Sequence, residues 1–253
     1  MRTNTAEKIY KFIQEQGQTT PKKIIDFIGF SAPAVFRQLK KLQERELIQK
    51  SGVPPRVLYH LPMTPKERLI QETILWVINI QAEIINNKDF YCPTRDVFQF
   101  RTERILKALL DSGLDESLSY LLVAVIGEIG NNSYDHNLGN WPDIPGVFFK
   151  VDLPERLIML ADRGQGVLTT LKKIRPNIAD DTEALRTAFT EIISGRSPEH
   201  RGNGLKFVRR VIEENKLTLT FYSGQGKCLI ENGGIKFLKA EKNVKGTAAI
   251  IEF

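Results

Sequence analysis

The sequence predicts an α+β protein with a small N-terminal domain, a connector and a larger C-terminal domain. The length of 253 residues suits about two domains of ordinary size. Apolar residues at helical spacing alternate along the chain with short apolar runs typical of strands. Prolines and a break in the hydrophobic pattern near residues 62–65 separate the small segment from the large one.

The composition excludes several other classes of protein. Hydrophobic residues make up 42% of the chain and charged residues 26%, which is ordinary for a globular protein and excludes collagen-like and wholly disordered chains. Only two cysteines, Cys92 and Cys228, are present, so we expect no disulfide framework and a reducing compartment. No signal peptide and no apolar run long enough to span a bilayer is recognisable. We therefore expect a cytoplasmic protein that does not contact the membrane.

The positive charge is concentrated at the N-terminal end of the chain. The formal net charge is +6. Residues 1–61 contain 11 Lys and Arg against 5 Asp and Glu, whereas residues 62–253 contain 25 of each sign. A basic small domain beside a neutral large one indicates that the small domain meets a polyanion. Charge alone leaves open the alternative of a Lys-rich domain with no nucleic-acid role.

Residues 1–61 carry the pattern of three helices followed by two strands. Residues 5–16 have apolar side chains at helical spacing and end at a glycine. A second helix starts at Thr20-Pro21, because proline at the first helical position loses no hydrogen bond. After a glycine turn, Ser31 is expected to cap a third helix, SAPAVFRQLKKLQERE. The segment LIQKSGVPPRVLYHL then reads as two short strands around a turn.

This order of elements resembles the winged helix-turn-helix family of bacterial regulators. The most telling piece is S-x-x-A-V-x-x-x-L-x-x-L, followed by LIQK and VLYHL. In that family the third helix enters the major groove of DNA and the wing contacts the backbone. The resemblance implies DNA-binding residues on or near the exposed face of the third helix and at the wing, namely Ser31, Ala34, Arg37, Gln38, Lys41 and Arg56.

The side-chain chemistry suggests different roles within this set. Arg37 and Gln38 are suited to reading base edges, whereas Lys41 and Arg56 are suited to contacting phosphates. Acidic residues alternate with the basic ones after the third helix begins, and they would repel phosphate if they faced the groove. The alternative is a winged helix used for protein contact or dimerisation. The charge distribution favours double-stranded DNA.

Residues 62–94 are predicted to form a helical connector. Within it, residues 66–87 read as one long helix whose broad apolar side must be buried. Two interpretations are open. The helix packs on the second domain, or it pairs with a second subunit in a homodimer, because winged helices usually read paired half-sites as dimers.

Residues 116–137 form a further helical pattern with a polar row. Glu128, Asn132 and His136 recur at spacing four and so project from one side, which we expect to be the inner half of an otherwise apolar helix. A carboxylate and a carboxamide one turn apart can orient water and bind Mg²⁺ through oxygen. The alternative is a polar stripe that faces solvent.

Glycine-rich motifs follow this helix. Two strands in GVFFKVDLPERLIMLAD end at Asp162, and G-x-G comes directly after it, so a buried acceptor stands beside a backbone that a ligand can approach closely. The segment Arg201-Gly202-Asn203-Gly204-Leu205 opens a helix, where a glycine-rich turn offers N–H groups to phosphate oxygens. Three closing strands follow, and Gly246-Thr247 begins the last of them.

The ordered set E-x-x-x-N, D-x-G-x-G, G-x-G-L and G-T resembles the GHKL ATP-binding family of gyrase, chaperone, mismatch-repair and histidine-kinase ATPases. Each motif is weak alone, but four in this order on the expected elements are specific. The form E-I-G-N-N-S-Y-D-H-N looks most like the anti-sigma-factor serine kinases. The resemblance covers residues 95–253 and implies a GHKL (Bergerat) α/β sandwich with a mixed sheet.

The resemblance also implies roles for individual residues. Glu128 would be the general base, and Asn132 would bind Mg²⁺ and, through it, the phosphates of ATP. Asp162 would accept a hydrogen bond from the adenine amino group, and Thr247 would complete that contact. Residues 167–201 would form a mobile lid. The remaining nucleotide-binding residues would be Gly164, Gly166, Arg201, Gly202, Gly204 and Leu205.

These resemblances imply an ATP-binding, ATP-responsive DNA-binding transcriptional regulator. The alternative is a GHKL switch ATPase or protein serine kinase that acts on a partner protein, with the winged helix as a docking module. A third interpretation is an ATP-sensing module without catalysis. An autophosphorylating histidine kinase is not expected, because the helix at 66–87 contains no histidine to accept the phosphoryl group.

Overall fold

The computed structural model describes residues 5–78, 90–191 and 204–253. The chain divides into two compact units, Met1–Thr64 and Pro65–Phe253. Each unit has a hydrophobic core of its own.

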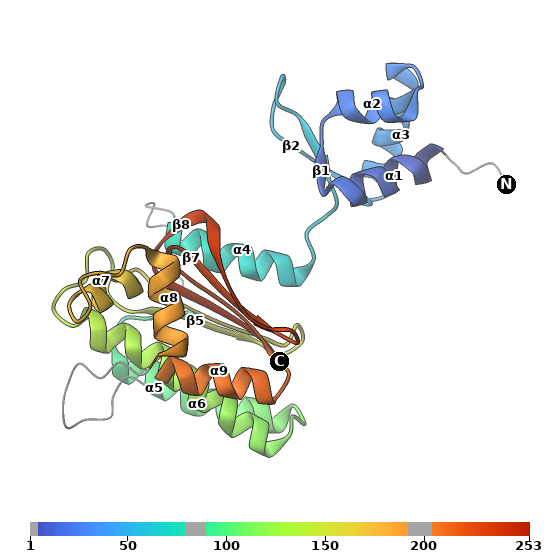
Figure 1. The fold of residues 1–253 in the computed structure, drawn as a ribbon. Helices are drawn as coiled ribbons and strands as arrows, with labels where there is room; N and C mark the ends of the chain where they lie inside the picture. Colours follow the sequence, from blue (N-terminus) through green and yellow to red (C-terminus); the bar gives the residue numbers. More distant parts are fainter. Residues whose placement is uncertain (1–4, 79–89, 192–203) are drawn as a thin grey trace. The chain divides into compact units, whose positions relative to one another are not determined.

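The first unit contains three helices and a small sheet (Figure 1). Its elements are α1 Thr5–Gln16, β1 Gln18–Thr19, α2 Pro21–Ile28, α3 Ala32–Glu44, β2 Gln49–Ser51 and β3 Leu58–His60. The strand order is β1-β3-β2 with both pairings antiparallel, so β2 and β3 form the predicted wing. Strand β1 was not predicted, because two residues are too few to show an alternating pattern.

The ends of α2 follow the sequence signals. The hydroxyl of Thr20 accepts a hydrogen bond from the backbone N–H of Lys23 at 3.3 Å. Gly29 ends the helix in the left-handed conformation with φ of +70°, a region that favours glycine. The start of α3 follows the prediction in position only. Ser31 stands at the N-cap position, but its side chain makes no capping bond. One of the two usual donors is missing there, because the second residue of α3 is Pro33.

The second unit is a five-stranded sheet with helices on both faces (Figure 1). Its elements are α4 Pro65–Ile78, β4 Tyr91–Cys92, α5 Arg95–Asp111, α6 Glu116–Asn137, β5 Val147–Asp152, β6 Leu157–Asp162, α7 Gly166–Lys172, α8 Asp181–Thr190, α9 Gly204–Glu214, β7 Thr218–Glu231 and β8 Gly234–Glu252.

The sheet has the order β4-β5-β6-β8-β7. The predicted mixed sheet is wrong for the described strands, because each of their pairings is antiparallel. Strands β6 and β7 do run in the same direction, but β8 lies between them and pairs with both. The three predicted closing strands are two long ones, β7 and β8, with register shifts between Ser223 and Gly226.

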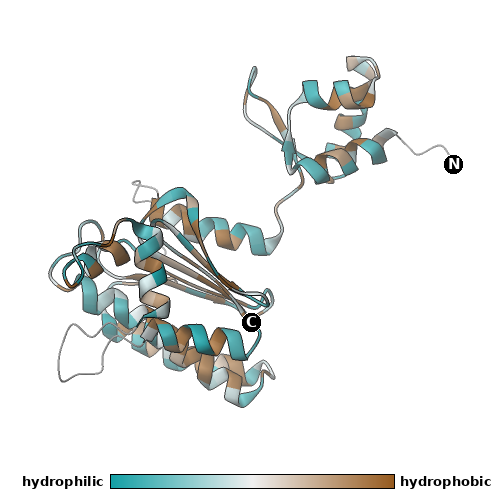
Figure 2. Ribbon diagram, viewed as in Figure 1, coloured by the Kyte–Doolittle hydropathy of each residue, from teal (hydrophilic) through white to brown (hydrophobic). Residues whose placement is uncertain are grey.

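Both faces of β6 are buried, which explains its nearly continuous apolar sequence. Ile158 and Leu160 point into a core shared with α5, α6, α8 and α9. Leu157, Met159 and Ala161 point to the other face, where α4 packs. Figure 2 shows the apolar residues gathered along the strands and on the helix sides that face them.

Helix α4 packs on the sheet of the second unit, as one of the two interpretations of the connector helix predicts, and pairing with a second subunit stays a prediction. Trp76 and Val77 are buried against the sheet of their own unit. Residues 65–78 therefore pack within the chain, whereas residues 79–87 of the predicted helix lie outside the described residues. None of the described helices is long and apolar enough to cross a bilayer.

Candidate functional site

A buried carboxylate stands at the C-terminal end of β6. Asp162 is only 1% exposed. Its Oδ2 accepts hydrogen bonds from the hydroxyls of Ser133, at 2.8 Å, and Thr247, and its Oδ1 accepts one from the N–H of Gly164, at 2.8 Å. Thr247 reaches Asp162 because the two residues are register partners in the β6–β8 pair. The structure thus brings together Asp162, Thr247 and Gly164, which come from two of the predicted motifs.

Glycines let the backbone segments around this carboxylate approach one another. A Cβ on Gly246 would lie 2.3 Å from the carbonyl oxygen of Asp162, and Gly246 has a φ of +61°. A Cβ on Gly164 would lie 2.0 Å from the side-chain nitrogen of Asn137. At Gly246 a side chain would displace Asp162 and the Gly164 N–H that bonds it, and at Gly164 a side chain would displace Asn137.

Burial dominates the electrostatics of Asp162. Loss of solvent raises the pKa of this carboxyl, although the hydrogen bonds from Thr247, Gly164 and Ser133 and the nearby His136 act in the opposite direction. A carboxylate whose ionised form is poorly solvated gains from any further hydrogen-bond donor that reaches it.

The predicted general base and metal ligand lie at the start of α9. A Cβ on Gly204, the first residue of that helix, would be 2.3 Å from Glu128 Oε2 and 3.6 Å from Asn132 Nδ2. Glu128 is exposed, Asn132 is half-buried and His136 is exposed. The row therefore does not lie on the inner half of α6, as expected, but runs along its solvent side. Two predicted motifs meet here, because a glycine leaves room for the carboxylate of Glu128 and lies at ordinary contact distance from Asn132.

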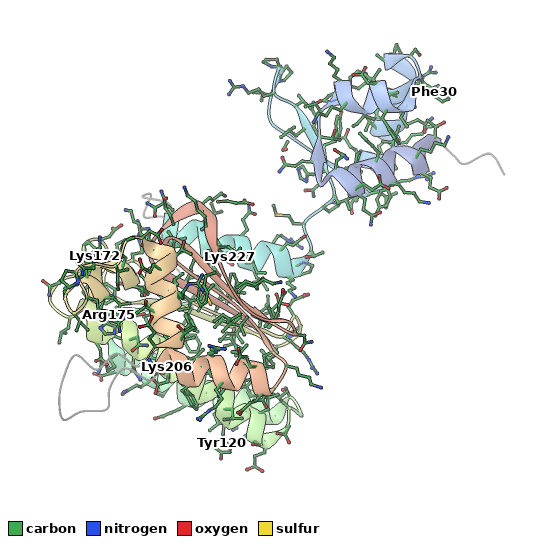
Figure 3. The ribbon with its side chains drawn as sticks, viewed as in Figure 1. Phe30, Tyr120, Lys172, Arg175, Lys206 and Lys227 are labelled. Atoms are coloured by element: carbon green, nitrogen blue, oxygen red, sulfur yellow. The ribbon has the colours of Figure 1, made fainter. Side chains whose placement is uncertain are left out.

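Further residues complete this region. Leu205 is half-buried against the core of the second unit, and Gly166 is the first residue of α7. Arg201 and Gly202, and part of the predicted lid, lie outside the described residues, whereas α7 and α8 occupy most of its described part. Lys206 adds a cation at the start of α9 (Figure 3), and burial lowers its pKa.

Among the residues that the structure describes, the side chains at this site do not make a complete set of metal ligands. Among the described residues, no group of three or more His, Cys, Asp or Glu side chains could hold a metal ion. Near Gly204, the carboxylate of Glu128 and the carboxamide of Asn132 could contribute side-chain oxygen ligands. Mg²⁺ commonly completes its shell with water and substrate phosphates, so this donor set suits Mg²⁺ that arrives with a nucleotide.

Two buried residues of α6 were missed by the sequence reasoning. Besides the bond from Ser133 to Asp162, Asn137 Oδ1 accepts from the N–H of Gln165 at 2.7 Å, and Asn137 Nδ2 donates to the carbonyl of Ser133 at 2.8 Å. Ser133 and Asn137 lie four residues apart on the row that continues the buried positions of α6. The sequence did contain a sign of their role, because both are polar residues at positions of α6 where the helical spacing predicts buried apolar ones.

A buried arginine follows Asp162 directly. Arg163 is 1% exposed, and its guanidinium donates to Asp143 Oδ2, with Nε at 3.0 Å, and to the carbonyl of Trp76 at 2.9 Å. Lys245 also donates to Asp143 Oδ2, at 2.7 Å. Burial alone would raise the pKa of Asp143, but the hydrogen bonds from Lys245 and Arg163 lower it below its ordinary value. The sequence patterns predict no role for Arg163.

A cavity of about 390 Å³ opens beside these residues. Its polar lining includes Asp143, Arg163, Asp181, Ser223 and Lys245, together with the backbone of Gly164, Gly166 and Gly246. This volume lies within the range of small-molecule sites. The cavity adjoins the Asp162 cluster through the shared glycines, whereas Glu128 and Asn132 are not part of its lining.

In the first unit, α3 carries most of the predicted DNA-binding residues. Ser31, Arg37 and Lys41 are exposed, and Ala34 and Gln38 are half-buried. Arg56, between β2 and β3 in the wing, is exposed. The opposite side of α3 is buried through Val35, Leu39 and Leu42, so the helix presents its basic side to solvent.

Comparison with known proteins identifies the first unit. Residues 2–49 match a family model described as winged helix-turn-helix DNA-binding, which spans α1, α2 and α3. No curated protein matches the chain. The chain therefore contains an N-terminal winged helix-turn-helix DNA-binding domain, which supports a regulatory role on DNA. The match ends before the second unit, where the GHKL assignment stays a prediction.

Proposed function

We propose that this protein is a transcriptional regulator whose DNA binding responds to ATP. The winged helix supplies the DNA contact, and the second unit binds ATP with Mg²⁺. The observation that carries the nucleotide half is the Asp162 cluster, in which a buried carboxylate is held by two hydroxyls and a backbone N–H. A buried acceptor of this kind selects a ligand that donates a hydrogen bond.

Asp162 has capacity for the adenine amino group. Each carboxylate oxygen offers two lone pairs, and Oδ1 accepts one hydrogen bond, from Gly164. An amino group can therefore add a second bond to Oδ1 without displacing Ser133 or Thr247 from Oδ2. Because the carboxylate is buried, this added bond is stronger than the same bond in water.

The arrangement around Gly204 suits the phosphates. Asn132 and Glu128 would hold Mg²⁺ through their side-chain oxygens, and Gly204 leaves space between α6 and the start of α9. Bound Mg²⁺ would supply the positive charge that offsets the triphosphate. The N–H groups in the first turn of α9 and the Lys206 ammonium would add further attraction for phosphate oxygens.

The contact of Arg163 with α4 supports a response to nucleotide. Arg163 follows Asp162 in sequence and donates to the carbonyl of Trp76 near the end of α4. Helix α4 begins at Pro65, directly after the winged-helix unit. A ligand that moved the Asp162 segment would therefore act on the helix that is covalently joined to the DNA-binding domain.

A catalytic function that uses Glu128 as general base is the second candidate. Its carboxylate is exposed beside Asn132 and Gly204, where a general base would meet water or a protein hydroxyl. This chemistry corresponds to a switch ATPase or a protein serine kinase. Phosphate release, or phosphorylation of a partner, that disappears in Glu128→Ala would favour it, whereas nucleotide binding without turnover would count against it.

Calorimetry with ATP and Mg²⁺ tests the nucleotide half. The wild type should bind, and Asp162→Asn should bind roughly 10- to 100-fold more weakly, because a hydrogen bond to a charged group is lost. Asp111→Asn is the matched control, since this exposed residue at the end of α5 should leave binding unchanged. Absence of adenine-nucleotide binding to the wild type would remove this half of the proposal.

DNA titration with and without ATP tests the regulatory half. The full-length protein should bind duplex DNA at low salt, and ATP with Mg²⁺ should change that affinity. In Asp162→Asn the affinity without nucleotide should persist, while the effect of ATP should vanish. Identical DNA affinities of the wild type in both conditions would contradict the response to ATP.

A further inference from the structure

One large apolar side chain on the basic side of α3 has no role in the core. Phe36 is 45% exposed, although it belongs to a helix whose other large apolar residues are buried. Among the ring contacts of the described residues, none involves Phe36. A single exposed apolar residue is ordinary at a protein surface, so its position on the helix decides what it means.

Phe36 lies among the cations of the helix that meets DNA in this type of domain. Arg37 is its neighbour in sequence, and Lys40 follows one turn later on the same side, both exposed. The positive charge of the chain is concentrated in residues 1–61, and the family match places α3 within a DNA-binding domain. A polyanion is therefore the partner that the charge selects, and Phe36 would be desolvated when it binds.

The other exposed aromatic residues of the first unit differ from Phe36. Phe27, at 55% exposure, stacks on Phe12 of α1 with ring centroids 4.1 Å apart, so it has a packing partner within the domain. Phe30, at 54% exposure, stands at the corner between α2 and α3 and precedes the helix (Figure 3). Phe36 alone of the three lies within α3.

We infer that Phe36 is a specificity-determining residue that packs on the C5-methyl group of thymine in the major groove. The methyl group of thymine is the apolar feature of the major-groove edge, and phenylalanine is one of the side chains that contacts it. Arg37, which follows Phe36 on the exposed part of α3, can form hydrogen bonds to a neighbouring base edge, and Phe36 would add an apolar contact with thymine. The inference rests on the DNA-binding part of the proposed function and does not depend on ATP.

The experiment compares thymine with uracil, which lacks only the methyl group. The full-length protein first selects ligands from a library of random duplexes, with and without ATP and Mg²⁺. In the selected duplex, each thymine is then replaced in turn by deoxyuridine and the affinity is measured. At one position per half-site the wild type should lose about fourfold in affinity, the value of burying one methyl group.

Variants assign that loss to Phe36. Phe36→Ala should bind the thymine duplex more weakly and should no longer distinguish thymine from uracil. Phe36→Leu, which keeps an apolar side chain, should retain part of the discrimination. Phe27→Ala is the matched control, because this aromatic residue is also exposed but lies outside α3, so its loss should leave the fourfold difference intact. Circular dichroism checks that each variant is folded.

Several results would overturn the inference. It fails if the wild type binds uracil and thymine duplexes equally at every position, or if Phe36→Ala keeps the discrimination. It also fails if Phe36→Ala changes the sedimentation of the free protein but not the thymine effect, since Phe36 would then serve contact between copies. Absence of DNA binding in every condition removes the DNA half as well. A thymine effect without any effect of ATP supports the inference and contradicts only the response to ATP.

Discussion

At the scale of single residues, the second unit contains a buried aspartate and a buried arginine that are adjacent in sequence, Asp162 and Arg163. Asp162 receives neutral donors, whereas Arg163 is paired with Asp143 and with the carbonyl of Trp76. Alternation along the strand end explains the difference, because consecutive side chains point to opposite faces of a sheet. Asp162 meets α6 on one face, and Arg163 meets α4 on the other.

Asp162→Asn is expected to fold and to lose part of the pH dependence of stability. Burial raises the pKa of Asp162 in the folded state, so the stabilisation linked to its protonated form is complete below the unfolded pKa of about 4 and is lost as pH rises through the folded pKa. The free energy of unfolding of the wild type should therefore decline more than that of the variant from pH 4 toward neutrality. Denaturant unfolding at a series of pH values measures this. Parallel profiles would contradict the prediction, and Asp111→Asn should follow the wild type.

Arg163→Met is expected to destabilise the second unit by roughly 3 kcal/mol. The substitution removes one partner of a buried ion pair, a change that typically costs about 3–5 kcal/mol, and Lys245 remains to pair with Asp143. Arg209→Met is the matched control, because its partner Glu213 lies one turn away on the half-exposed side of α9 and the pair should be worth about 0.5 kcal/mol or less. Urea denaturation followed by tryptophan fluorescence compares them. Equal midpoints for the two variants would show that burial of Arg163 adds nothing.

At the scale of elements, the helix ends show where a local sequence rule holds and where it fails. The hydroxyl of Thr20 caps α2, which starts at Thr20-Pro21 as the sequence predicts. Ser31 occupies the same position on α3 without making the bond. The boundaries of α6, Glu116–Asn137, agree with the predicted helix, because its apolar periodicity is long and is preceded by Asp115 as the N-cap.

These two caps should respond differently to alanine. Thr20→Ala should destabilise α2 by about 1 kcal/mol, the usual value of a side-chain cap, whereas Ser31→Ala should change the stability of α3 by less than about 0.5 kcal/mol. Native-state hydrogen exchange of the amides of α2 and α3 resolves the two effects. If Ser31→Ala proves as costly as Thr20→Ala, the side chain of Ser31 caps α3 in solution.

At the scale of the whole molecule, the charge distribution separates two kinds of anion binding. The excess of +6 lies in residues 1–61, where Lys and Arg side chains would meet DNA phosphates. Residues 62–253 carry no net charge. The proposed nucleotide site must therefore attract phosphate through local groups, namely backbone N–H groups, Mg²⁺ and single cations such as Lys206.

The salt dependence of DNA binding should reflect this distribution. Each phosphate contact contributes about 0.9 to the slope of log affinity against log salt concentration. Lys41→Ala should therefore lower that slope by about 0.9, whereas Lys107→Ala, at an exposed position of α5 in the second unit, should leave it unchanged. Titrations of duplex DNA across a salt series measure both. Equal reductions in the two variants would show that the charge excess does not mark the DNA face.

Local patterns in the sequence determined which segments are helices and strands. The three helices and the wing of the first unit, α6, and the β5–β6 hairpin all follow from periodicity and turn residues within about twenty positions. The motifs also indicated Asp162, Thr247 and Gly164, which the structure joins. Such features are readable because hydrophobic spacing and turn chemistry act between near neighbours.

Only the tertiary structure decided which of these elements meet. It placed β8 between β6 and β7, so that a sheet expected to be mixed is antiparallel in all its described pairings. It turned the Glu128 row toward solvent, and it brought Ser133 and Arg163 into contacts with residues 29 and 87 positions away. No local pattern contains these pairings, because they depend on how the faces of the whole sheet are covered. Because both faces of the sheet are buried, polar residues there must form hydrogen bonds with one another instead of with water.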